Sequence, residues 1–196
     1  MAGALSGRNA LVLGVERPAG RRAAVALAEA GANVAVVTLT DDTKAEFAAN
    51  STANEFWAIG VRGIALTSDG RETTVKEAIA DATAELGPVS ILVWHAPHPL
   101  PADTLAGLRS DPAIIVIASA DSTPEEAAAL IGWARDLSAS GLRANAVVMS
   151  HVLADAAGPV LDRHQPPGVA DVASAAVYLA SDASAAIDGA VIVVEP

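Results

Sequence analysis

The sequence predicts an α/β fold in which one doubly wound, mostly parallel sheet of seven strands lies between two layers of helices. Short apolar runs rich in β-branched residues alternate with longer segments of helical periodicity along the chain. Parallel strands need such helical connections, which cover both faces of the sheet. The composition does not shift and no segment repeats, so we expect a single domain over residues 1–196.

The segment 7–39 has the pattern of a β-α-β unit. An apolar run from Asn9 to Leu13 meets a turn at Gly14, a helical pattern extends from Pro18 to Ala30, and a second β-branched run covers Val34 to Thr38. Such a unit places the amino end of its helix at the carboxyl end of the first strand. Folds of this kind receive a phosphate at that place.

The remaining elements continue the alternation. Asp41 and Asp42 favour the start of a helix, and the Gly87-Pro88 pair ends a later one. Three prolines within 97–101 leave room only for a short helix after them. A capping box at Thr123–Glu126 starts another helix. The predicted order is helix 41–57, strand 61–66, helix 71–86, strand 89–95, helix 103–108, strand 113–118, helix 123–138, strand 142–149, a loop over 150–168, helix 169–180 and strand 190–195.

Composition limits the possible chemistry and partners. Hydrophobic residues make up 52% of the chain but aromatic residues only 3%, so the core must consist of Ala, Val, Leu and Ile. The absence of cysteine excludes disulfides, thiolate catalysis and Cys-ligated metals. A net charge of -11 disfavours nucleic acid and anionic membranes. Without a long apolar stretch or a basic-then-apolar leader, we expect a soluble, cytoplasmic protein with neither kind of partner.

Several segments, in chain order, resemble the short-chain dehydrogenase/reductase family. LSGRNALVLG (5–14) resembles the family's LxGKxALVTG, and LAEAGANVAVV (27–37) its LAxxGAxVVV. Further similar segments are SILV (90–93), GLRANAV (141–147), DVA (171–173) with YLASD (178–182), and Asp188-Gly189. The resemblance implies a Rossmann-like fold and a dinucleotide cofactor, NAD or NADP. It specifies architecture better than chemistry, because several of these segments are scaffold.

The resemblance assigns four cofactor-binding candidates, which are Gly14, Arg17, Gly20 and Thr38. The family's TGxxxGxG falls on residues 13–20 and keeps Gly14 and Gly20 as its first and last glycines. Pro18 replaces the middle glycine, so it adds a ring and removes an N–H where a pyrophosphate would approach. Arg17 stands where NADPH-using relatives often carry a basic residue for the ribose phosphate. Thr38 ends the second strand, where relatives contact the ribose.

Other changes lie elsewhere in the dinucleotide footprint. The family's NNAG is replaced by Trp94-His95-Ala96-Pro97, and we expect bulky Trp94 to fill the cofactor crevice. We therefore expect no tightly bound cofactor, with NADP or NAD as the candidates if one binds.

The family's catalytic Ser, Tyr and Lys are not all present. The only tyrosine is Tyr178 and the only lysines are Lys44 and Lys76, so no Tyr-x-x-x-Lys exists in this chain. Ser119 falls near the family's serine, but the segment that should carry Tyr and Lys is missing. We interpret the chain as a shortened and degenerate relative without the family's redox chemistry.

Chemistry other than the family's redox reaction, at the carboxyl edge of the sheet, is an open alternative. Four candidate catalytic residues lie at the end of predicted strands or just after them, so their side chains can meet at the carboxyl edge: His95, Ser119, Asp121 and His151. They could form a nucleophile with its base. A metal site of His95, His98 and His151 has no support from spacing, and we expect none.

Three functions are compatible with these observations. We favour a non-catalytic structural or regulatory subunit that assembles with itself or with an active homologue through residues 169–195. The first alternative is an atypical NADP(H)-dependent oxidoreductase that uses Arg17 for the phosphate and Ser119 or His95 as proton donor. The second is a non-redox enzyme or small-molecule binder that uses the same crevice.

Overall fold

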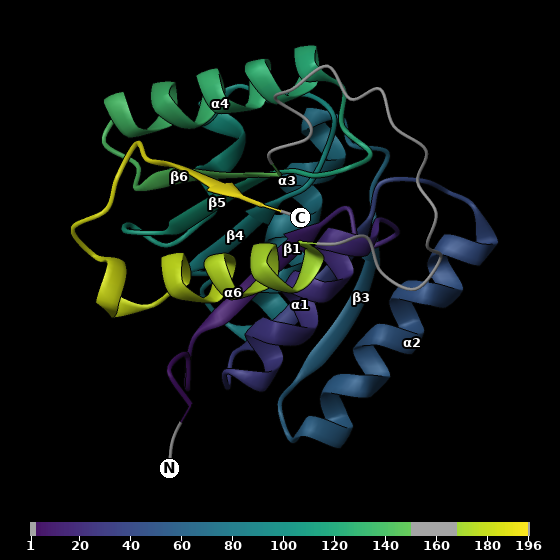
Figure 1. The fold of residues 1–196 in the computed structure, drawn as a ribbon. Coiled ribbons are helices and arrows are strands. Elements are labelled where there is room, and N and C mark those ends of the chain that lie inside the picture. Colours follow the sequence, from purple (N-terminus) through teal and green to yellow (C-terminus); the bar gives the residue numbers. More distant parts are fainter. Residues whose placement is uncertain (1–2, 150–167, 196) are drawn as a thin grey trace.

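A computed structural model describes residues 3–149 and 168–195. Within these residues one sheet contains seven parallel strands in the order β3-β2-β1-β4-β5-β6-β7, which confirms the predicted architecture (Figure 1). The strands are β1 Asn9–Leu13, β2 Asn33–Thr38, β3 Gly63–Thr67, β4 Ile91–Trp94, β5 Ala113–Ala118, β6 Ala144–Met149 and β7 Val191–Val194. The order reverses between β1 and β4, which is the switch point where such sheets open a crevice.

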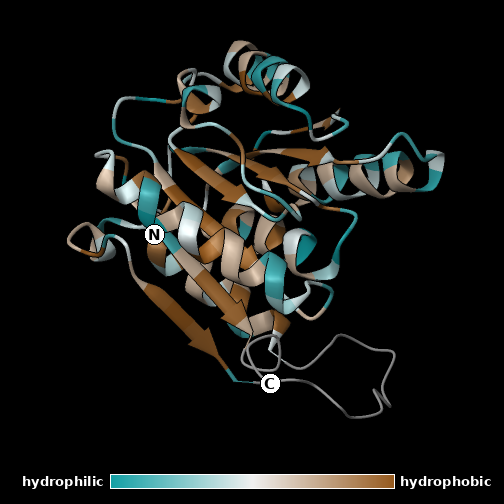
Figure 2. Cartoon of the chain, turned by 90° about the horizontal axis from the view of Figure 1, so that it is seen from above, coloured by the Kyte–Doolittle hydropathy of each residue, from teal (hydrophilic) through white to brown (hydrophobic). Residues whose placement is uncertain are grey.

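Helices cover both faces of the sheet. On one face α1 (Pro18–Glu29) lies between α2 (Thr43–Ile59) and α6 (Val169–Ala180), and on the other lie α3 (Glu72–Leu86) and α4 (Pro124–Ala139) (Figure 1). Every residue of β1, β5 and β6 is buried, as expected for strands covered on both sides. Figure 2 shows these central strands as mostly hydrophobic. None of the described helices is long and apolar enough to cross a membrane.

The boundaries differ from the prediction around the proline-rich segment. The helix predicted at 103–108 is only a 3₁₀ turn, η1 (Ala102–Leu105), which ends just before Gly107, a poor helix former. β4 covers Ile91–Trp94, so it is shorter than the predicted strand 89–95. A second 3₁₀ turn, η2, covers Asp182–Ser184. The loop predicted over 150–168 lies, except for its last residue, outside the described residues.

Two arginines fix the carboxyl end of α6 at the amino edge of the sheet. Arg8, just before β1, donates to the Ala180 carbonyl at 2.6 Å, and Arg143, just before β6, donates to the Leu179 carbonyl at 2.9 Å. Positive charge at the end of a helix is favourable because the last carbonyls are unsatisfied and carry the negative end of the helix dipole. α6 therefore runs antiparallel to the strands and begins at their carboxyl edge.

Candidate functional site

The glycine loop between β1 and α1 packs directly on the end of β4. A Cβ at Gly14, whose φ is +83°, would lie 2.0 Å from the carbonyl oxygen of His95. A Cβ at Gly20 would lie 2.3 Å from the Gly14 carbonyl oxygen and 3.0 Å from His95 Nδ1. Both predicted cofactor glycines are thus required by close contact within the protein itself. The sequence pattern did not reveal this contact.

The residue that fills the space beside the glycine loop is His95, and the prediction for Trp94 was wrong. Trp94 is fully buried, lies edge-on to Trp133 of α4 with ring centroids 5.2 Å apart, and donates its indole N–H to the His98 carbonyl at 3.2 Å. Successive residues of an extended chain point to opposite faces of the sheet. Trp94 therefore faces the α4 layer, and the imidazole of His95, next in the chain, reaches the α1 layer at Gly20.

Three predicted catalytic candidates meet at the carboxyl edge of the sheet. Nε2 of His95 lies 2.8 Å from Ser119 Oγ, and the Ser119 hydroxyl donates to the Asp121 carboxylate. Asp121 also lies 3.6 Å from His95 Nε2 and, through its other oxygen, 3.4 Å from Nε of Arg17. Arg17, a predicted cofactor residue, thus joins the cluster from across the β1–β4 switch point. His151 lies outside the described residues.

This cluster, His95-Ser119-Asp121-Arg17, differs from a Ser-His-Asp triad. In a triad the carboxylate binds Nδ1 of the histidine while Nε2 faces the serine. Here Asp121 and Ser119 both lie at Nε2, and Nδ1 has no hydrogen-bond partner among the described residues. The serine proton is directed to Asp121, so His95 is not placed to remove it.

Asp121 is held in its ionised form. Burial opposes ionisation, but contacts from His95 and Ser119 and the positive charge of Arg17 outweigh that penalty and keep the pKa of Asp121 well below its usual range. The carboxylate therefore stays an acceptor for its three partners at neutral pH and does not serve as a proton donor.

The loops after β1 and β2 are linked by a contact that sequence reasoning missed. Thr38, the fourth predicted cofactor residue, is fully buried, and its hydroxyl donates to the Thr40 carbonyl at 3.1 Å. Glu16, in the glycine loop, accepts a hydrogen bond from the backbone N–H of Leu39 at 3.2 Å. The loops after β1 and β2 are thereby joined. Sequence offered no signal for this pair, because the two residues lie on different loops whose conformation is set by the fold.

The tyrosine and the lysines lie away from Ser119. Tyr178 belongs to the carboxyl end of α6, which the two arginines hold at the amino edge of the sheet, whereas Ser119 follows β5 at the opposite edge. Lys44 lies in the first turn of α2, and Lys76 of α3 pairs with Glu72 and Asp103. No tyrosine or lysine therefore belongs to the cluster.

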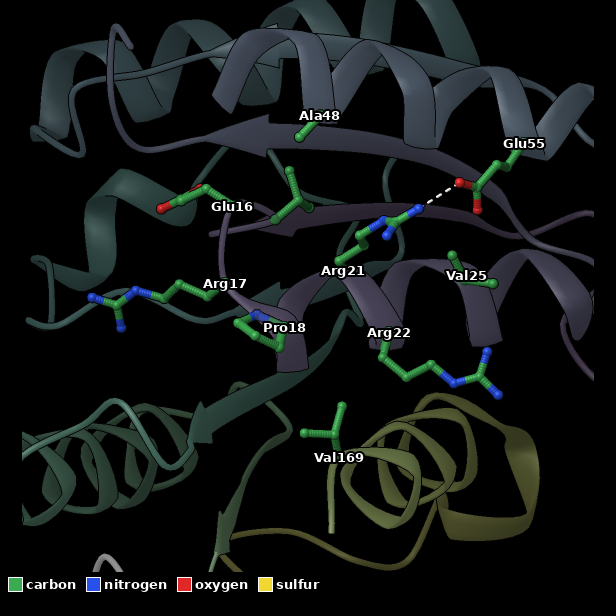
Figure 3. Close-up of a pocket in the computed structure, with 10 residues that line it drawn as sticks. Glu16, Arg17, Pro18, Arg21, Arg22, Val25, Ala48, Glu55 and Val169 are labelled. Carbon is green, nitrogen blue, oxygen red and sulfur yellow. Dashed lines mark hydrogen bonds and ion pairs between the residues drawn. The ribbon is translucent and has the colours of Figure 1, made fainter. Parts of the chain in front are cut away.

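A cavity of ≈480 Å³ lies beside α1 and the glycine loop. It is lined by the end of that loop, α1, α2 and the start of α6, including Arg17, Arg21, Arg22, Glu55 and Val169 (Figure 3). Figure 3 shows Arg21 turned toward Glu55, with which it forms an ion pair. Neither His95 nor Ser119 lines it, so this cavity gives no support to the alternative of a non-redox enzyme or small-molecule binder that uses those residues. Within the described residues, no group of three or more His, Asp and Glu side chains could hold a metal.

The comparisons with known proteins identify the fold. No protein-family model matches the chain, and no curated protein matches it significantly in sequence. Among solved structures, a short chain dehydrogenase from Mycobacterium paratuberculosis bound to NAD is 22% identical with a TM-score of 0.76, over 98% of this chain and 97% of that one. A blue fluorescent protein from a metagenomic library in complex with NADPH is 23% identical with a TM-score of 0.74, over 97% of both chains. Carveol dehydrogenase from Mycobacterium avium in complex with NAD is 19% identical with a TM-score of 0.73, over 98% of both.

These likenesses agree with the resemblance found in the sequence. The chain has the Rossmann-like α/β fold of short-chain dehydrogenase/reductases over nearly its whole length. The absence of the family's Tyr-x-x-x-Lys is a property of the sequence itself.

Proposed function

We propose that this chain is a non-catalytic, single-domain relative of the short-chain dehydrogenase/reductases, spanning residues 1–196, that serves in the cytoplasm as a structural or regulatory subunit of an oligomer. The His95-Ser119-Asp121-Arg17 cluster is the observation that carries this proposal. Its side chains bind one another at the carboxyl edge of the sheet, where the resemblance puts Ser119 near the family's catalytic serine. Ser119 and Asp121 are engaged within the cluster and have little left to offer a substrate, and the two nitrogens that lack a partner among the described residues, His95 Nδ1 and Arg17 Nη1, are buried.

The chemistry argues against hydride transfer with the family's mechanism. Reduction of a carbonyl needs a proton donor beside the hydride acceptor, and a tyrosine with a neighbouring ammonium supplies it in the family that this chain resembles. Ser119 gives its proton to a carboxylate whose pKa is lowered, so the proton is poorly placed for delivery to a substrate. His95 is fully buried beneath the glycine loop.

The surface formed by α6 and β7 supports assembly. β7 is an edge strand that pairs only with β6 within the described sheet, and its sequence is Val191-Ile192-Val193-Val194. Val193 is 47% exposed and Tyr178, on α6, is 44% exposed. An apolar edge strand with free backbone groups invites pairing with another chain. A second copy of this protein or an active homologue would cover it.

Sedimentation of the purified chain tests the proposal. We expect a species larger than the monomer, alone or with a co-purifying reductase, and a smaller species for Val193→Asp. Ala80→Asp, on an exposed position of α3, adds the same charge elsewhere and should leave the mass unchanged. A monomer under all these conditions would overturn the assembly, and hydride turnover by the purified chain would overturn the non-catalytic role.

A second candidate is an atypical NADP(H)-dependent oxidoreductase. Arg17 is the N-cap of α1 and makes no side-chain capping bond, so the positive end of this helix lies at the crevice where it favours an anion. The complexes of structural neighbours with NADPH and NAD give this candidate further support. Calorimetric titration with NADPH decides between the two. Micromolar binding that weakens in Arg17→Ala would favour the oxidoreductase, whereas no binding would favour the non-catalytic subunit.

A further inference from the structure

The outer face of α2 carries two strongly exposed aromatic side chains. Phe47 is 75% exposed and Trp57 is 74% exposed, in a chain that has only two phenylalanines and three tryptophans. With Asn50 and Asn54 they follow one stripe of the helix, at spacings of three and four residues. Figure 1 shows α2 along one side of the molecule, next to the edge strand β3. We call this stripe the α2 face.

The α2 face is free of charge between its two aromatic residues. The other exposed positions between them are Asn50, Ser51 and Asn54, and the exposed carboxylate of Glu46 directly precedes Phe47 at the edge of this face. The only charged residue between them is Glu55, whose carboxylate pairs with Arg21 of α1. For a chain with a net charge of -11, an uncharged stripe is a part of the surface where a second copy can approach with little local repulsion.

A hollow of ≈180 Å³ lies beside this face, between α2 and β3. Its lining contains Ala49 and Leu66 together with polar groups of Glu46, Asn50 and Thr67. The hollow therefore sits near the amino half of α2, at the level of Phe47, whereas Trp57 is near the carboxyl end. A buried tryptophan needs an acceptor for its indole N–H, and the carboxylate of Glu46 and the hydroxyl of Thr67 are acceptors of that kind.

We propose that the α2 face binds the α2 face of a second copy, with the helices antiparallel. A twofold axis at the level of Thr52 sets each Trp57 opposite residues 46–50 of the other copy, where the hollow can receive its indole. The small side chains between the aromatic residues let the helix axes approach closely. The antiparallel arrangement also places the positive end of each helix dipole near the negative end of the other. The contact is isologous, as twofold symmetry requires.

The area shows what this contact can achieve. A large aromatic side chain buries roughly 150–250 Å², so the exposed three quarters of four such side chains supply about 450–750 Å². Stable interfaces bury about 1,200–2,000 Å², so the α2 pairing is a weak contact that adds to another interface. It goes beyond the assembly proposed at α6 and β7 and involves a different surface. Two distinct twofold contacts on one chain produce a closed tetramer or an open filament.

Sedimentation of variants, combined with tryptophan quenching, tests the α2 contact. Trp57→Glu and Phe47→Glu should each reduce the largest species to the assembly held by α6 and β7 alone, while Ala80→Glu on α3, with the same added charge, should not. Trp94 and Trp133 are buried, so the emission quenched by acrylamide comes from Trp57. In the wild-type chain that quenchable fraction should fall as protein concentration rises.

The outcomes separate this contact from the one at α6 and β7. The α2 pairing would be overturned if only Val193→Asp lost assembly, Trp57→Glu kept the wild-type mass, and Trp57 was equally quenchable at every concentration. That result would support the interface at α6 and β7. If instead Trp57→Glu lowered the mass and Val193→Asp did not, the α2 pairing would be supported and the interface at α6 and β7 would be overturned. Association of the chain with uncharged lipid vesicles through Trp57, without self-association, would assign the face to a membrane surface and overturn the pairing.

Discussion

Replacing Gly20 with alanine should destabilise the protein even though Gly20 lies inside α1. Helix propensity alone predicts the opposite, because alanine is about 1 kcal/mol more favourable than glycine within a helix. The new Cβ would lie 2.3 Å from the carbonyl oxygen of Gly14 and 3.0 Å from Nδ1 of His95. The first contact is with backbone, so no side-chain rotation can relieve it.

The expected magnitude follows from this contact. Overpacking usually costs about 1–3 kcal/mol. Gly14 cannot retreat easily, since the position of its own missing Cβ lies 2.0 Å from the carbonyl oxygen of His95, and this places the cost near the upper value. Subtracting the gain in helix propensity leaves a loss of about 2 kcal/mol in the free energy of unfolding. For a chain of this length that lowers Tm by roughly 4–8 °C.

Gly132 offers a matched control. It lies in α4, and a Cβ there would meet nothing within 4 Å, so Gly132→Ala should raise the free energy of unfolding by about 0.5–1 kcal/mol. Urea and thermal unfolding followed by circular dichroism measure both variants. If Gly20→Ala proved as stable as the wild type, or both glycines shifted stability in the same direction, the close packing of the glycine loop on β4 would be refuted.

Three further predictions concern the cluster and the core. Asp121→Asn should cost about 1–2 kcal/mol at neutral pH, a value reduced by the partial exposure of the carboxylate. The pKa of Asp121 is lower in the folded protein than in the unfolded chain, so the difference in stability between the variant and the wild type should hold above about pH 4 and shrink below it. A difference in urea midpoint that stayed constant down to low pH would contradict the ionised role of Asp121 in the cluster. Trp94→Ala should cost about 3–5 kcal/mol in urea unfolding by leaving a cavity beside Trp133, whereas equal stability would contradict that packing. Asn145→Ala should cost about 2 kcal/mol and speed amide exchange at Ala190, since the buried Asn145 side chain joins β6 to the start of β7; unchanged exchange there would refute that role.

The fold was predictable because its signals are local. Apolar runs such as 113–118 and the capping box at Thr123 fix element types without reference to the rest of the chain, and the structure has both where predicted. The helix predicted at 103–108 was wrong in type, because a short segment that contains Gly107 forms only one 3₁₀ turn.

The site was predictable only to the level of which strand ends meet. The rule for parallel sheets brought His95, Ser119 and Asp121 together correctly. It did not reveal which of Trp94 and His95 faces the glycine loop, because that depends on the register of β4 and on the helices that cover each face. Contacts between loops, such as Glu16 with the Leu39 backbone, depend on tertiary structure alone.

The packing of α1 against α6 has a consequence for biosynthesis. α1 ends at Glu29 and α6 begins at Val169, so a ribosome must add some 140 residues before the second helix can cover the first. At roughly 5–20 residues per second, the nascent chain exposes that side of α1 for about 7–30 s. The hydrogen bond from Arg8 to the Ala180 carbonyl likewise joins the start of the chain to a segment that is synthesised much later. Translation that stalls or stops before α6 emerges should therefore leave a species that chaperones bind and proteases degrade.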